Sequence, residues 1–325
     1  MLRKAVDGRA HLQNEFLRYQ QNGFYNEENG GSAFIQRWTE YHLQYGLTLE
    51  QTATLQPGNA FAAVTNTATA ANWVVYHVFS DQSLLQACRE ELSKAITVTE
   101  EKDGPSGNNI KTVWTLNMDY VKTSCHILLA VLKETFRFHA IGKSIRIAVE
   151  DEYLTDPNSP NKRYLIKKGS IVFMPVRVQH RLHENGWGPG ETDDPVSDDY
   201  DLNKFDHTRF IPKPGQKRSD RSKPGAWRIF GGGATLCPGR HFATTEILAY
   251  AAMLVLRFDI RPTGKDGRWP RPTTKNSTQM EALEQPDHDV DVLLTQRKEA
   301  AGKEWRFSVG AEAGNGHAAI LAEDM

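Results

Sequence analysis

The segment Phe230–Ala243, with the sequence FGGGATLCPGRHFA, holds the residues best suited to chemistry. Its three consecutive glycines let the backbone approach a large flat group, because glycine has no Cβ atom. Cys237 follows them, and a helical pattern begins near Arg240. The sulfur therefore precedes a helix N-terminus, where free N–H groups and the helix dipole stabilise a thiolate. A lone cysteine beside glycines is usually structural, but the whole pattern indicates a thiolate with a function.

A possible acid–base pair lies upstream on a predicted helix. Glu134 and Arg137 stand three residues apart in the sequence KETFR, within the segment Cys125–His139, whose apolar residues recur at helical spacing. Pairs at this spacing usually lie on solvated helix faces, so this pair is weak evidence of a site by itself.

The elements that must position these residues predict a mainly α fold of the α+β class. A second helix is expected over Ser83–Ile96, and strands over Ser144–Val149, Tyr164–Ile166 and Ile171–Met174, the last two joined by a KKG turn. Composition predicts loops at three places: Glu100–Asn109, Gly186–Tyr200 and Pro262–Thr274.

A long segment without charge, Gln51–Ser80, contains no Asp, Glu, Lys or Arg but is rich in Thr, Asn and Gln. A helix facing lipid would not carry so many polar groups without partners. We expect a long helix in the middle of the protein, where some side chains pack and others line a cavity. A plain core helix is the alternative.

Composition excludes some classes of protein. The 325 residues include 39 Lys plus Arg against 40 Asp plus Glu, a net charge of −1. A nucleic-acid binder needs a basic excess, so no nucleic-acid partner is expected. The three cysteines, Cys88, Cys125 and Cys237, are too few and too scattered for a disulfide framework. The N-terminus lacks the apolar core of a signal peptide, and no segment is typical of a membrane span.

Taken together, these motifs resemble the cytochrome P450 family, in which Phe-x-x-Gly-x-x-x-Cys-x-Gly is the haem-binding loop and Glu-x-x-Arg lies upstream of it. Between the two motifs, FDHTRF supplies the family's aromatic residues and arginine at Phe205, Phe210 and Arg209. The preceding sequence HRLHENGWG, His180–Gly188, is similar to the family's usual approach to this segment. The resemblance covers roughly Leu47 to Lys298.

The resemblance implies haem b, iron protoporphyrin IX, as the cofactor, with the Cys237 thiolate as the metal ligand. Phe230 would pack beside the sulfur and keep water away from it, while Gly233 and Gly239 would shape the haem-binding loop. Arg146 would donate to a haem propionate, for which a guanidinium fork is well suited. The alternative for Arg146 is an ordinary exposed arginine on a strand.

Other residues receive roles from the same resemblance. Glu134, Arg137 and Arg209 would form a buried charge cluster that holds the segment Phe230–Gly239, here called the Cys loop, against its neighbours. Substrate would be contacted near three segments: Thr65–Thr69, Ile141–Ile145 and Met280–Leu283.

Two departures from the common family pattern carry information. Thr235 stands where the family usually has Arg or His, as in the sterol 7α-hydroxylase branch. The oxygen-binding helix reads Thr65, Asn66, Thr67 where the common pattern is acid-Thr-Thr, and the sterol 7α-hydroxylase and prostacyclin synthase branch also has Asn there. These three residues are the expected catalytic residues. Asn66 can hold water or oxygen by hydrogen bonds but cannot relay a proton as a hydroxyl does.

The expected function is that of a haem-thiolate monooxygenase, which inserts one oxygen atom from O2 into a lipophilic, sterol- or terpenoid-like substrate. The expected electron donor is an NADPH-dependent reductase. One alternative is a haem-thiolate isomerase or dehydratase that acts without external O2. Another is an inactive remnant that binds no haem.

The family's chains are longer at the N-terminus, so we expect a truncated chain. Residues 1–46 would be a remnant of helices that cap the substrate cavity, residues 47–298 the haem-binding domain, and residues 299–325 a disordered tail. The full-length protein is expected at the endoplasmic reticulum membrane, with membrane contact through the missing N-terminus. This chain, without an anchor, would be soluble and cytoplasmic.

Overall fold

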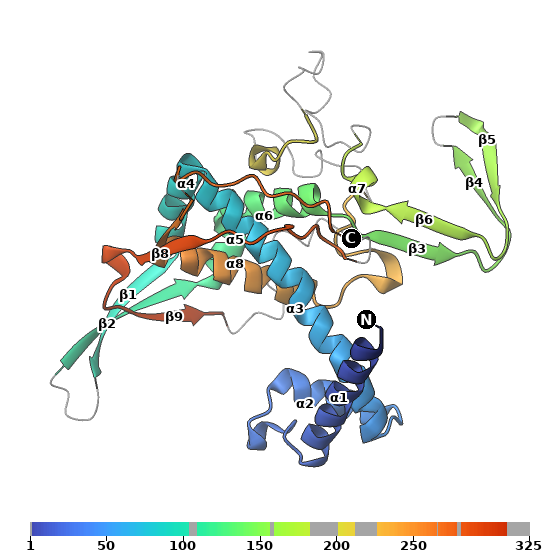
Figure 1. Cartoon of the computed structure of the whole chain (residues 1–325), viewed down its shortest axis with the longest axis horizontal. Helices are drawn as coiled ribbons and strands as arrows, with labels where there is room; N and C mark the ends of the chain where they lie inside the picture. Colours follow the sequence, from blue (N-terminus) through green and yellow to red (C-terminus); the bar gives the residue numbers. More distant parts are fainter. Residues whose placement is uncertain are drawn as a thin grey trace. The chain divides into compact units, whose positions relative to one another are not determined.

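The computed structural model describes residues 2–103, 109–156, 159–182, 201–211, 226–264, 266–277 and 281–310. The chain forms two compact units, Met1–Asn66 and Thr67–Met325. Figure 1 shows the course of the chain and the labels of its elements. The expected loop Gly186–Tyr200 and most of the expected HRLHENGWG motif lie outside the described residues.

The first unit is helical. It holds helix α1, Leu2–Gln21, a short 3-10 turn, η1, Glu27–Asn29, and helix α2, Ala33–Gln44. Ser32 caps α2, because its hydroxyl accepts a hydrogen bond of 3.3 Å from the Ile35 amide.

Helix α3, Leu49–Ser80, confirms the long uncharged helix that the sequence predicts. The division between the two units falls inside it, after Asn66. In the second unit its buried side chains are spaced for one face of a helix and include Ala70, Trp73, Val74 and Val78.

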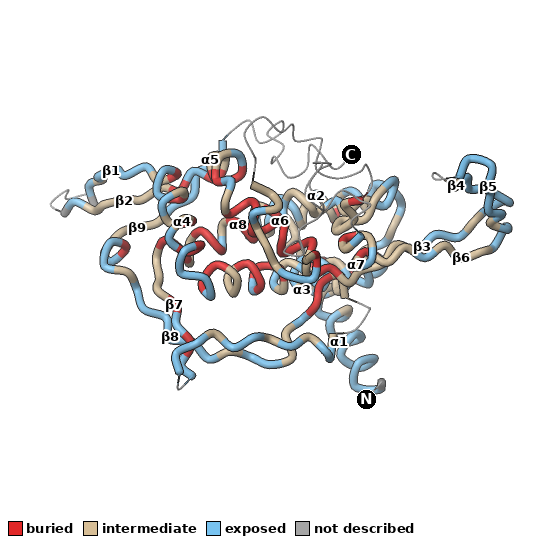
Figure 2. The backbone as a smooth tube through the Cα atoms, turned by 90° about the horizontal axis from the view of Figure 1, so that it is seen from above, coloured by how far each residue is buried: buried red, intermediate tan, exposed pale blue. Residues whose placement is uncertain are grey.

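The core of the second unit is formed by apolar faces of α3 and of four further helices. These are α4 (Gln82–Ser93), α5 (Met118–Ser124), α6 (His126–His139) and α8 (Arg240–Arg257). Buried residues recur every three or four positions along α8, whereas nearly all residues of α6 from Leu128 to Arg137 are buried (Figure 2). The helices expected over Ser83–Ile96 and Cys125–His139 are confirmed, although Ile96 already begins a strand. The mainly α prediction is therefore confirmed.

Within the described residues the strands form four small sheets. In the first, β1 (Ile96–Asp103) pairs antiparallel with β2 (Asn109–Asn117), and β2 pairs parallel with β9 (Glu304–Ser308). Three antiparallel pairs make the others: β3 (Lys143–Ile147) with β6 (Ile171–Pro175), β4 (Glu152–Asp156) with β5 (Ser159–Ile166), and β7 (Phe258–Pro262) with β8 (Val292–Gln296). The remaining short helices are α7 (Val176–Gln179), η3 (His207–Phe210), η5 (Gly233–Thr235) and η6 (Lys298–Ala300).

Two sequence predictions are corrected by the first sheet. The expected loop Glu100–Asn109 contributes residues 100–103 and 109 to the paired strands β1 and β2. The tail was expected to be disordered from residue 299, but Glu304–Ser308 is strand β9. Residues 311–325 lie outside the described part of the chain.

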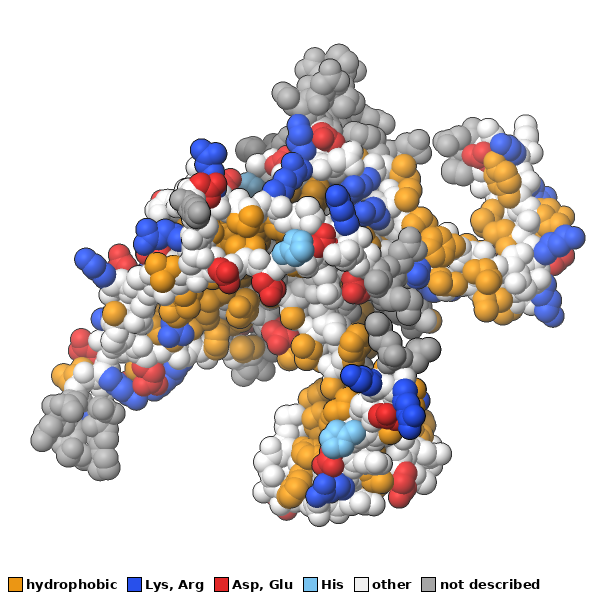
Figure 3. All heavy atoms as spheres, in the orientation of Figure 1, with side chains coloured by type: hydrophobic (Ala, Val, Ile, Leu, Met, Phe, Trp, Pro, Cys, Tyr) orange, Lys and Arg blue, Asp and Glu red, His pale blue; other side chains and the backbone are white. Residues whose placement is uncertain are grey.

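The pair β3–β6 fixes the direction of Arg146. Side chains alternate between the faces of a strand, so Ile145 and Ile147 lie on one face and Arg146 on the other. Ile145 is opposite Phe173, and all three apolar side chains are at least 48% exposed. Figure 3 shows hydrophobic side chains gathered over this pair and over β4–β5. Arg146 thus projects from the face opposite this apolar patch.

None of the helices in the described part of the chain combines the length and the hydropathy needed to cross a membrane.

Candidate haem-thiolate site

The Cys loop is a tight turn closed by backbone hydrogen bonds. The Cys237 amide donates to the Phe230 carbonyl at 2.9 Å, and the Leu236 amide donates to the Gly233 carbonyl at 3.1 Å. Gly231 and Gly233 have φ angles of 84° and 62°, a left-handed conformation that side chains with a Cβ atom rarely adopt. The run of glycines therefore has a conformational reason.

At Gly232 a Cβ atom would meet the guanidinium of Arg228, which is the far end of a flexible side chain and can shift. After the cysteine, α8 begins at Arg240, whose amide lies 3.4 Å from the Cys237 carbonyl and whose side chain donates to the same carbonyl at 3.1 Å. The structure thus places Cys237 in the last turn before a helix N-terminus, as the sequence predicts.

The three thiols have different surroundings. Cys88 and Cys125 are fully buried in the core, whereas Cys237 is half-buried. Burial raises the pKa of the Cys125 thiol to about 12 and that of Cys88 further, so both remain protonated. Cys237 is the thiol that an external group can reach.

Arg146 reaches the Cys loop from strand β3. Its Nη2 donates to the Gly232 carbonyl at 3.1 Å and to the Thr235 hydroxyl at 2.7 Å. The side chain remains exposed on its other sides. Thr235 stands where the family commonly has Arg or His, and it is a hydrogen-bond partner of Arg146. Arg146 is the arginine to which the resemblance gives the role of binding a haem propionate. Phe230 packs against Phe136 of α6, with 5.4 Å between the ring centroids.

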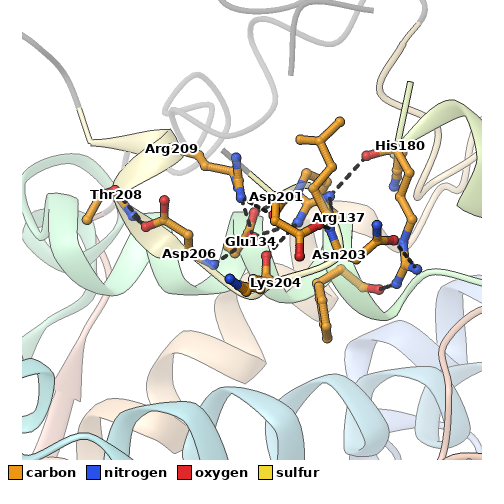
Figure 4. Close-up of polar contacts among 12 residues, drawn as sticks. Glu134, Arg137, His180, Asp201, Asn203, Lys204, Asp206, Thr208 and Arg209 are labelled. Carbon is orange, nitrogen blue, oxygen red and sulfur yellow. Dashed lines mark hydrogen bonds and ion pairs between the residues drawn. The ribbon is translucent and has the colours of Figure 1, made fainter. Parts of the chain in front are cut away.

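Glu134 and Arg137 form a buried pair rather than a surface pair. Both side chains are 0% exposed, and two hydrogen bonds of 2.7 Å join the guanidinium to the two carboxylate oxygens. Burial raises the pKa of the Glu134 carboxyl, and the charge and hydrogen bonds of Arg137 oppose that rise. Figure 4 shows the pair with its partners.

Residues 201–210, which precede and include η3, make further contacts with this pair. Arg209 lies 3.4 Å from Glu134 Oε1, and the Asp206 amide donates to the same oxygen at 2.9 Å. Arg137 in turn donates to the carbonyls of Leu202 and His180, each at 3.1 Å. The structure therefore brings together Glu134, Arg137 and Arg209.

His180 extends this cluster toward the Cys loop. Its carbonyl accepts from Arg137, while its ring Nε2 accepts from the Arg228 amide at 3.1 Å. The same ring stacks on Trp227, with 5.5 Å between centroids. Trp227 and Arg228 are separated from the start of the Cys loop by one residue, so one buried histidine links the cluster to this part of the chain. The sequence motif contains His180, but its specific role was not predicted.

Two of the segments expected to contact substrate lie side by side. The amides of Ile141 and Gly142 donate to the Ala282 carbonyl at 2.9 and 3.2 Å. Ala140 forms an isolated antiparallel bridge with Leu283. Met280 lies outside the described residues.

Thr65, Asn66 and Thr67 lie on α3, with Asn66 exposed and the two threonines half-buried. Thr65 and Asn66 belong to the first unit and Thr67 to the second. Because each unit is described by itself, the catalytic role of these three residues stays a prediction.

Comparison with known proteins identifies the family. A model of the family Cytochrome P450 matches residues 2–286. The chain is 31% identical over 313 residues to "Cytochrome P450 monooxygenase nodJ" of Hypoxylon pulicicidum, covering 94% of this chain and 55% of the relative. It is 27% identical over 285 residues to a "Cytochrome P450 monooxygenase" of Gibberella zeae, covering 86% of this chain and 50% of the relative.

A sterol-hydroxylase relative matches a smaller part. "Cholesterol 7-alpha-monooxygenase" of Cricetulus griseus is 27% identical over 205 residues, covering 62% of this chain and 36% of the relative.

The chain belongs to the cytochrome P450 family. It spans about half the length of the two fungal relatives. The family match begins at residue 2, well before the residue 47 at which the resemblance was expected to start.

The family implies haem with a cysteine thiolate ligand, and the residues present fit that group. Cys237 offers a half-buried thiol in a turn shaped by glycines, before the positive end of α8. Arg146 lies beside the same loop with an exposed guanidinium suited to a carboxylate.

Proposed function

We propose that the chain is the haem-binding part of a haem-thiolate monooxygenase that inserts one oxygen atom from O2 into a lipophilic substrate. The observation that carries this proposal is the half-buried Cys237 in its glycine turn before α8. When bound, haem with a thiolate ligand supplies the activation of O2. The chain itself supplies the ligand, the anchoring of the cofactor and the exclusion of water.

Each of these tasks has a residue. Cys237 would hold the iron, and Phe230, packed on Phe136, would shield the sulfur from water. Arg146, oriented by Thr235, would bind a haem propionate. The buried cluster of Glu134, Arg137 and Arg209 would keep the Cys loop in place.

The proposed substrate is sterol- or terpenoid-like, and the proposed electron donor is an NADPH-dependent reductase. Apolar residues in the paired segments, Ile141 and Ala282, support an apolar substrate. The sterol 7α-hydroxylase relative and the charge-free helix α3 point in the same direction.

The proposal is tested by titrating the chain with haemin, reducing it with dithionite and adding CO. The red-shifted absorption band of a thiolate-ligated CO complex is the expected result. Haem bound without that band, or no haem binding, would contradict the proposal and favour the inactive remnant. Turnover of a peroxide without NADPH and reductase would replace the monooxygenase by the isomerase.

A further inference from the structure

A second, largely buried polar network consists of His77, His139 and Glu284. The Nε2 atoms of His77 on α3 and His139 on α6 are 2.9 Å apart. His139 Nδ1 lies 3.4 Å from Glu284 Oε2, and Arg177 of α7 contacts the same carboxylate. The side chains of His139 and Glu284 are at most 10% exposed. Three residues far apart in sequence thus form one chain, here called the His–Glu chain.

The geometry fixes where the protons lie. A carboxylate only accepts hydrogen bonds, so His139 must carry its proton on Nδ1. Burial lowers the pKa of both rings, that of His77 to about 3, and both are therefore neutral near pH 7. The His139 Nε2 is then an acceptor, and His77 must donate to it. Within the His–Glu chain, His77 therefore donates to His139, and His139 donates to Glu284.

Aromatic packing holds the two rings in these orientations. Trp73 stacks on His139 with 3.8 Å between centroids, and His77 stacks on Phe205 with 3.5 Å. Trp73 also donates from its indole nitrogen to the Glu284 carbonyl at 2.7 Å. The His–Glu chain therefore has little freedom to rearrange without moving its neighbours.

Two members of the His–Glu chain, His139 and Glu284, lie in the two paired segments, residues 139–142 and 282–284. The Glu284 amide donates to the His139 carbonyl at 2.9 Å, and the amides of Ile141 and Gly142 donate to Ala282. The contacts made by His139 and Glu284 therefore control how closely residues 139–142 approach residues 282–284.

We propose that His77, His139 and Glu284 are positioning residues that set the separation of the paired segments 139–142 and 282–284. The inference rests on the proposed function in one respect, namely that these segments border the substrate. A buried carboxylate needs its partners, because an unpaired buried charge is strongly unfavourable. Loss of the His77 donor leaves the buried His139 Nε2 without its hydrogen-bond partner, so the His139 ring should move and shift the segment that carries Glu284.

The first experiment measures amide hydrogen exchange in the chain without haem. His77→Phe keeps the stacking on Phe205 but removes the donor, whereas His77→Gln restores a donor near the Nε2 position. We expect exchange at Ile141, Gly142 and Glu284 to be about five- to tenfold faster in His77→Phe, the factor for losing a hydrogen bond between two neutral groups. His77→Gln should stay within about threefold of the wild type, since the hydrogen bond is retained.

Two further variants act at the carboxylate. Glu284→Gln should speed exchange at the same amides, whereas Asp289→Asn removes an exposed charge from the same segment and should not. The inference is overturned if His77→Phe leaves these amides unchanged. It is also overturned if exchange rises uniformly over α6 and α8, because that result means general destabilisation.

The second experiment uses the haem-loaded chain and compares imidazole with 1-dodecylimidazole. Imidazole contacts the iron alone, while the dodecyl tail extends along the walls of the substrate cavity. Movement of the paired segments should weaken binding of the tailed probe about tenfold in His77→Phe, with imidazole unchanged. Equal effects on both probes would contradict the link to substrate. A chain that binds no haem contradicts the proposed function, and hydrogen exchange still decides the positioning inference.

Discussion

Arg146 Nη2 lies 2.7 Å from the hydroxyl of Thr235, which joins strand β3 to the Cys loop across 89 positions of sequence. The same nitrogen reaches the Gly232 carbonyl at 3.1 Å. The arginine is thus oriented by the loop that carries Cys237, although its side chain is exposed. A threonine where the family commonly has a basic residue therefore has a structural purpose: it fixes a basic residue that comes from elsewhere.

Haem affinity should depend on both partners. Arg146→Gln removes the charge that would bind a propionate and should weaken haem binding about ten- to 100-fold. Thr235→Val leaves the charge in place and removes one acceptor, so it should weaken binding less. Haemin titration followed by the Soret absorbance measures both. Arg163→Gln, on exposed strand β5, is the matched control and should have no effect. Unchanged affinity in Arg146→Gln would mean that Arg146 is an ordinary exposed arginine.

The axial ligand is tested by substitution of the cysteines. Cys237→Ser should abolish the red-shifted CO band, because a neutral hydroxyl cannot replace a thiolate donor. Cys88→Ala and Cys125→Ala should keep the band, since both thiols are buried in the core with raised pKa values. Absorption spectra of the reduced CO complexes decide the matter. Retention of the band in Cys237→Ser would exclude this cysteine as the ligand.

The buried cluster makes a prediction about stability. Glu134→Gln leaves Arg137 and Arg209 as buried guanidinium groups without a carboxylate, which should lower the free energy of unfolding by about 3–5 kcal/mol. Urea denaturation followed by circular dichroism measures this. Glu299→Gln removes an exposed partner, 67% accessible, of Arg297 and should change little. Equal stability of Glu134→Gln and the wild type would contradict the importance of the cluster.

Local motifs explain what the sequence could predict. The Cys loop and the helix carrying Glu134 and Arg137 each lie within a few consecutive residues, so residue types and spacing were sufficient. The burial of that pair could be expected only from the family resemblance, because three-residue spacing alone is equally typical of a solvated face.

Long-range partners explain what it could not predict. The polar sequence of β1 is typical of a loop, yet Glu101 accepts from Arg306 of β9 at 2.7 Å, and Trp114 of β2 packs on Trp305 at 5.1 Å. The tail is a strand because β2 offers it an edge. Likewise His77 and Glu284 meet His139 across 62 and 145 positions, and no local pattern records such contacts.

A buried histidine should make the fold sensitive to acid. Burial, together with the charge of Arg137, lowers the pKa of His180 to about 3, compared with about 6.5 for an unfolded chain. Its ring is a neutral acceptor for the Arg228 amide, a hydrogen bond that a protonated Nε2 could not accept. Between these two pKa values the unfolded state binds a proton that the folded state excludes. The stability that the neutral His180 contributes is therefore fully present above about pH 6.5, and it is lost as the pH falls toward 3.

The contribution of His180 can be measured by removing its titration. His180→Gln keeps a polar side chain of similar reach but cannot bind a proton. The wild type should lose about 2 kcal/mol more unfolding free energy than this variant between pH 7 and pH 5, because one proton is worth about 1.4 kcal/mol per pH unit. Urea unfolding at several pH values gives the slopes, with the exposed His288→Gln as the control that should follow the wild type. Parallel slopes for the wild type and His180→Gln would show that His180 is not the neutral link between the charge cluster and the Cys loop.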